Sequence, residues 1–148
     1  MTRIDFYLNA ESKLQVACKI SAKAMRQRMR VLILAPDDAM ARALDRLLWT
    51  SPATGFLAHC MTTDRLAAET PILIARSQDA QPHDELLINL GTTPPPLFSR
   101  FQRLVELVSI DDDADKLAAR QRFRFYKDRG YKLSHHDLAS PGKGGPSD

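Results

Sequence analysis

Three short, largely apolar runs constrain the fold of this chain more than any other feature of its sequence. They are VLILA at residues 31–35, PILIA at residues 71–75 and ELLINL at residues 85–90. Runs of this kind are typical of strands buried on both faces, as in a parallel sheet covered by helices. Because parallel strands need long crossover connections, which are usually helices, the runs predict an α/β protein.

The segments around the first run supply the helices that such a sheet needs. Residues 3–8 alternate apolar and polar side chains, which predicts a first strand, and Asn9 is a candidate cap for the helix that follows. Residues 11–29 gather apolar side chains on one face, which predicts an amphipathic helix. Asp37 or Asp38 is expected to cap a second helix. The order strand–helix–strand–helix predicts parallel pairing with right-handed crossovers.

The second half of the chain adds a fifth strand and a last helix to the prediction. Apolar and polar side chains alternate enough in residues 103–110 to predict a strand less deeply buried than the others. A helix over residues 97–107 is the alternative. The 148 residues, with 44% hydrophobic content, suit a single domain. We predict a three-layer α/β/α domain with a mostly parallel central sheet over residues 1–133. Residues 134–148 end in a segment rich in Pro, Gly and Ser, which predicts a disordered tail.

This architecture is Rossmann-like, but the motifs of nucleotide-binding and hydrolytic enzymes are missing. The turn after the first strand reads Asn9-Ala10-Glu11, with no glycine and with a carboxylate where a phosphate would sit. No GxGxxG, GxxxxGK[ST] or GxSxG sequence occurs. We therefore expect no bound cofactor and no enzymatic activity; a small hydrolase or nucleotide-binding protein is a disfavoured alternative.

The remaining candidates for catalysis or metal binding have simpler explanations. Asp37 and Asp38 follow a strand, where catalytic acids often sit, but helix capping accounts for them. His59 and Cys60 are sequence neighbours, which rarely have the geometry of a nucleophile and its base. The other cysteine, Cys18, is far away, and no zinc-binding spacing occurs. We expect no catalytic residue and no metal. The two distant cysteines fit a reduced cytoplasm, and no apolar run reaches membrane-spanning length.

The last predicted helix, within residues 111–132, carries the feature that points most directly to a function. Aspartates crowd its start, and Gly130 stands where a left-handed residue is expected to end it. With about 100° per residue, four basic side chains fall within an arc of roughly 80°. These four residues, which we call the basic stripe, are Lys116, Arg120, Arg124 and Lys127. Phe123 borders the stripe.

A basic stripe beside an aromatic ring suits an acidic peptide that ends in an apolar residue, because arginines hold carboxylates through paired hydrogen bonds. Two other interpretations stay open. The helix can be an ordinary solvated amphipathic helix. It can also bind nucleic acid directly, although a formal charge of +3 and a single bordering aromatic favour this less.

A second informative stretch, WTSPATGFLAHC, occupies residues 49–60. Pro52 bends the chain between two large apolar side chains, Trp49 and Phe56. Such side chains in a turn-rich segment are frequent anchors of protein interfaces, and a local packing cluster is the alternative.

The chain resembles the chi subunit family of bacterial DNA polymerase III, and the resemblance extends to about residue 135. It rests on FYL at residues 6–8, RVLILAPDDAMARALDRLLW at 30–49, SPATGFLAH at 51–59, ELLINL at 85–90 and KLAARQRFRFYKDRGY at 116–131. The resemblance implies a three-layer α/β/α fold without nucleotide binding. It also implies a non-catalytic accessory subunit of the clamp-loader assembly, which works in DNA replication and contacts DNA only weakly or indirectly.

Two partners are implied by this resemblance. One is the acidic, apolar-ended C-terminal tail of single-stranded DNA-binding protein, and the matching positions are Lys116, Arg120, Phe123 and Arg124. Lys127 completes that set as part of the basic stripe. The other partner is the psi subunit, for which Trp49 and Phe56 match and Pro52 lies between them. The family has a tyrosine where this chain has Phe123, which removes a hydroxyl but keeps the ring. We expect a monomer or a one-to-one heterodimer with psi.

Overall fold

The predicted apolar strands lie together in one sheet in the computed structural model, which describes residues 2–50, 59–61, 71–76 and 83–139. Within this part of the chain the sheet has seven strands in the order β3-β4-β2-β5-β6-β1-β7, and every pairing is parallel. The strands are β1 (Arg3–Ala10), β2 (Val31–Ala35), β3 (His59–Met61), β4 (Ile72–Arg76), β5 (Leu86–Asn89), β6 (Arg103–Ser109) and β7 (Leu133–Asp137).

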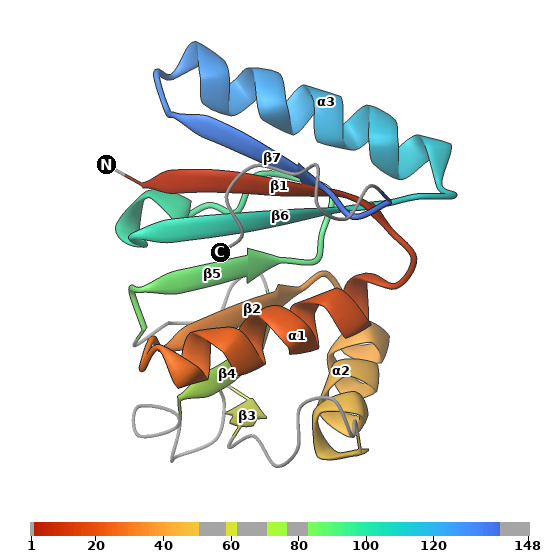
Figure 1. Ribbon diagram of the computed structural model, residues 1–148, viewed down its shortest axis with the longest axis vertical. Coiled ribbons are helices and arrows are strands. Elements are labelled where there is room, and N and C mark those ends of the chain that lie inside the picture. The colour runs from red at the N-terminus through yellow and green to blue at the C-terminus, as the bar shows by residue number, and fades with distance from the viewer. Residues whose placement is uncertain (1, 51–58, 62–70, 77–82, 140–148) are drawn as a thin grey trace.

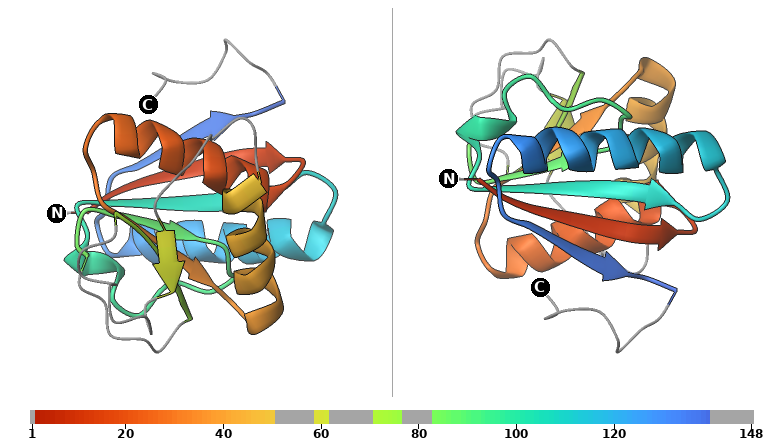
Figure 2. Two further views of the ribbon diagram at one scale, coloured as in Figure 1. Left: turned by 90° about the horizontal axis from the view of Figure 1, so that it is seen from below. Right: turned by 90° about the horizontal axis from the view of Figure 1, so that it is seen from above.

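Helices cover both faces of the sheet, as Figures 1 and 2 show. They are α1 (Lys13–Arg26), α2 (Asp38–Thr50) and α3 (Asp113–Asp128). In β2, Val31 and Ile33 pack in the core that includes α1 and α2, whereas Leu32 packs in the core that includes α3. Alternate residues of one apolar run therefore fill two separate cores. The predicted α/β fold with a parallel sheet is confirmed.

The start of α1 differs from the prediction in one detail. Its cap is Ser12, whose Oγ accepts a hydrogen bond from the backbone N–H of Gln15 at 3.3 Å. Asn9 instead takes a left-handed conformation, with φ of 62°, and its Nδ2 donates to Oδ1 of Asp137 at 2.7 Å. Asparagine is one of the few residues that adopt this conformation readily. The end of β1 is thus tied to the end of β7.

The predicted shallow burial of β6 is wrong. Its residues 104–108 are all buried, because β6 lies between β5 and β1 and is two strands away from the sheet edge. The edge strand on this side is β7, which was not predicted: residues 134–137, assigned from the sequence to a disordered tail, pair with β1. The helical alternative over residues 97–107 reduces to one short 3-10 turn at Phe98–Arg100. Residues 140–148 lie outside the described residues.

The last helix agrees closely with its prediction at both ends. The side chain of Asp112 caps α3 by accepting from the backbone N–H of Asp115 at 3.1 Å. Gly130 has φ of 85°, the left-handed conformation expected just beyond the helix. Ala119 and Tyr126 of α3 are buried, and the buried row of the helix also includes Arg122.

Candidate functional site

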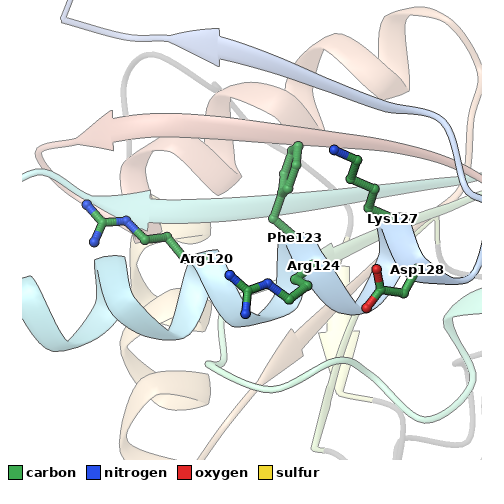
Figure 3. Close-up of a pocket in the computed structure, with 5 residues that line it drawn as sticks. All are labelled: Arg120, Phe123, Arg124, Lys127 and Asp128. Carbon is green, nitrogen blue, oxygen red and sulfur yellow. The ribbon is translucent and has the colours of Figure 1, made fainter.

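The outer face of α3 carries a shallow depression of about 440 Å³. Four of the residues that line it belong to the predicted set for tail binding: Arg120, Phe123, Arg124 and Lys127. The fifth, Asp128, was not predicted. Figure 3 shows Phe123 and Lys127 extending side by side to one side of the helix, and Asp128 to the other. The spacing of these residues along α3 thus places positively charged side chains and an aromatic ring around the same depression.

The ring of Phe123 is held in place from below. It packs against Phe6 of β1, with ring centroids 5.5 Å apart and the planes tilted by 59°. Phe6 is itself buried and contacts Tyr126 at 6.1 Å between centroids. Phe123 nevertheless remains 36% exposed. An incoming apolar side chain would therefore meet a ring that has already lost its conformational freedom.

The cations around this depression have no partner in the described part of the chain. The side chains of Arg120, Arg124 and Lys127 make no hydrogen bond or ion pair there, and all three are exposed. Lys116, the fourth member of the basic stripe, is half-buried and does not line the depression. The surface therefore offers positive charge that no side chain of the described residues pairs with.

A buried polar cluster lies beneath α3, and the sequence prediction missed it. Glu106 of β6 is fully buried and accepts hydrogen bonds from Nε of Arg122 at 3.0 Å, Nδ2 of Asn89 at 3.0 Å and the hydroxyl of Tyr126. Burial raises the pKa of the Glu106 carboxyl, and the positive charge of Arg122 opposes this rise. Burial also raises the pKa of Tyr126.

Two sequence signals could have revealed this cluster. Glu106 interrupts an apolar strand, and Arg122 lies about 200° around the helix from Arg120, on the side away from the basic stripe. When an acidic side chain on a buried strand and a basic side chain on the buried side of a helix face each other, they are expected to form an ion pair.

The second predicted surface is only partly described. Trp49 lies near the end of α2 and is 56% exposed, which fits an anchor for a partner. Pro52 and Phe56, the other two residues predicted for this surface, lie outside the described residues.

The residues considered for catalysis have structural roles where they are described. Oδ1 of Asp37 accepts from the backbone N–H of Met40 at 2.8 Å, and Asp38 pairs with Arg76 at 2.7 Å on the surface. Cys18 is buried, and burial raises the pKa of its thiol to about 11, which keeps it protonated. The backbone of residues 59 and 60 belongs to β3.

Neither a metal site nor a membrane span is found in the described ranges. No group of three or more His, Cys, Asp or Glu side chains there is arranged to hold a metal ion. Among the same residues, no helix combines the length and the apolar character needed to cross a membrane.

Comparison with known proteins gives consistent matches over nearly the whole chain. A family model described as "DNA polymerase III chi subunit, HolC" matches residues 1–134. A DNA polymerase III subunit chi from Pseudomonas aeruginosa is 37% identical over 142 residues, covering 93% of this chain and 98% of the relative. The subunit chi of Escherichia coli is 31% identical, covering 81% of this chain and 82% of the relative. That of Haemophilus influenzae is also 31% identical, with coverage of 84% and 86%.

Proposed function

Because the chain belongs to the family of DNA polymerase III chi subunits, we propose that α3 binds the acidic C-terminal tail of single-stranded DNA-binding protein. As a chi subunit, the protein is a non-catalytic accessory component of the DNA polymerase III holoenzyme. The observation that carries the proposal is the depression on α3, where cations without a partner among the described residues lie beside the packed ring of Phe123. Binding there would connect the polymerase assembly to protein-coated single-stranded DNA.

The chemistry of the depression matches such a tail. The guanidinium groups of Arg120 and Arg124 can each hold a carboxylate through two parallel hydrogen bonds. Phe123 offers one wall for an apolar side chain at the end of the peptide. Asp128 adds a negative charge at one end of the depression, where it would repel the carboxylates of a peptide bound in the wrong direction.

This proposal predicts a specific dependence on the peptide. A labelled acidic peptide with an apolar last residue should bind more weakly as the salt concentration rises, because exposed charges are screened. It should also bind more weakly when that last residue is removed. Fluorescence anisotropy titrations at two salt concentrations measure both effects. The controls are an acidic peptide of the same charge in scrambled order and a single-stranded oligonucleotide.

Two results would contradict the proposal. Equal affinity for the intact, shortened and scrambled peptides would show that the surface recognises charge alone. Tighter binding of the oligonucleotide than of the peptide would instead favour a nucleic-acid-binding domain.

We also propose that the segment with Trp49, Pro52 and Phe56 binds the psi subunit of the clamp loader. The support is the exposure of Trp49, since a large aromatic side chain that stays 56% exposed is a typical interface anchor. We propose accordingly that the protein is a monomer by itself and a one-to-one heterodimer with psi.

Trp49→Ala should weaken the complex with psi about tenfold, because truncation of an interface anchor commonly costs more than 1 kcal/mol. Isothermal titration of the full chain with purified psi measures this effect. Leu117→Ala is the matched control, since Leu117 is also 56% exposed but lies on α3. Unchanged affinity of the Trp49 variant would exclude this side chain from the psi interface.

A further inference from the structure

The side of α3 that faces the sheet is unusually polar for a buried surface. Its fully buried row consists of Asp115, Ala119, Arg122 and Tyr126. Three of these four side chains make buried polar contacts, and only Ala119 contributes purely apolar surface. Helices on sheets are ordinarily attached by an apolar stripe. Hydrogen bonds and ion pairs therefore attach α3 to the sheet in addition to the packing of its aromatic rings.

The first attachment is near the start of the helix. Oδ1 of Asp115 accepts from Nζ of Lys13 in α1 at 2.8 Å, and its Oδ2 accepts from the backbone N–H of Ser109 at 2.8 Å. The side chains of Asp115 and Lys13 are only 4% and 9% exposed. This carboxylate thus connects α3 both to α1 and to the end of β6.

The second attachment is the cluster around Glu106 in the middle of the helix. Arg122 extends from α3 to the Glu106 carboxylate, and its Nη1 also donates to the backbone carbonyl of Thr92 at 2.9 Å. Asn89 donates to the same carboxylate and to the carbonyl of Thr93 at 3.0 Å. The cluster thus joins α3, β6 and the segment that follows β5.

We infer that Glu106, Arg122 and Asp115 are positioning residues, which fix the rotation of α3 and thereby direct the basic stripe outward. An apolar contact tolerates a small rotation or shift, whereas these hydrogen bonds form in a single register. Arg120 lies about 200° from Arg122 around the helix, so burial of one directs the other away from the sheet. This inference rests on the proposed binding of the tail to α3.

The energetics of buried ion pairs allow positioning to be separated from stability. Replacing both partners of such a pair by apolar residues of similar volume is often neutral or stabilising, because the charges no longer lose their hydration. A double variant, Glu106→Leu with Arg122→Met, should therefore lose only a little stability, from the hydrogen bonds that Asn89 and Tyr126 no longer make, while the rotation of α3 is less well defined.

The experiment compares this double variant with the wild type in the full chain, using the labelled acidic peptide with an apolar last residue. Titrations at two salt concentrations are made well below the melting temperature. We expect a loss of affinity of about two- to thirtyfold, the usual range for changes in a coupled network that does not touch the ligand. The dependence on salt should become shallower, because fewer cations converge on the peptide. Tyr126→Phe, which removes one hydrogen bond and keeps the ring, gives a smaller loss of the same kind and serves if the double variant does not fold.

Arg120→Ala, titrated in parallel, separates failure of this inference from failure of the proposed function. Wild-type affinity and salt dependence in the double variant, with a loss in Arg120→Ala, would overturn the positioning role and leave tail binding in place. Wild-type affinity in both variants would overturn both. A lower melting temperature with an unchanged salt dependence would show that the cluster only stabilises the fold, and would also overturn the inference.

Discussion

Arg120→Ala should weaken binding of the acidic tail peptide about thirtyfold, which corresponds to about 2 kcal/mol. The side chain lines the depression beside Phe123 and has no ion-pair partner within the described residues, so its charge is available to a carboxylate of the peptide. The loss is at the low end of the range for hydrogen-bonded charge pairs, because the depression is shallow and open to solvent. The melting temperature should not change, since an exposed side chain is removed. Peptide titration and thermal unfolding measure the two quantities.

Two further variants make this result specific. Arg120→Lys should restore only part of the affinity, because an ammonium group cannot form the paired hydrogen bonds of a guanidinium. Arg42→Ala removes the same charge from the exposed side of α2 and should leave peptide affinity unchanged. If Arg42→Ala and Arg120→Ala weakened binding equally, net charge rather than the geometry of α3 would control binding.

The parts of the fold that were predictable are those with a strong local signal. The strand at residues 31–35 could be predicted from its apolar run alone, because both faces of β2 are buried and every residue must be apolar. The basic stripe was also predictable from the sequence, because residues on one exposed face of a helix recur at a fixed spacing. The aspartate cap of α3 and the glycine beyond its end have specific chemical signatures.

The features that were missed depend on contacts between distant segments. The strand β7 has the sequence LSHHD, which resembles a polar tail, and it forms because β1 offers an unpaired edge. The buried His136 lies 3.3 Å from a carboxylate oxygen of Asp5 on β1, a contact no local pattern shows. No role was predicted for Arg122, whose partner Glu106 lies in β6.

Arg122→Met alone should destabilise the fold by about 3–5 kcal/mol at neutral pH, more than any surface substitution considered above. The variant leaves the carboxylate of Glu106 fully buried without its counter-charge. The double variant with Glu106→Leu should recover most of this loss, because neither charge is then buried alone. Urea unfolding of the wild type, both single variants and the double variant gives the coupling energy of the pair.

The loss of folding stability caused by Arg122→Met should depend on pH in a defined direction. Burial already raises the pKa of Glu106, and loss of the Arg122 charge removes the main influence that lowers it, so the pKa rises further. A carboxyl group with a raised pKa in the folded state favours folding most when it is protonated. Its contribution is complete below the pKa of an unfolded glutamate, about 4.3, and is lost as the pH rises through the folded value. The deficit relative to the wild type should therefore be largest at neutral pH and shrink as the pH falls. A deficit that stays constant, or grows in acid, would show that the lost stability comes from packing rather than from an unpaired charge.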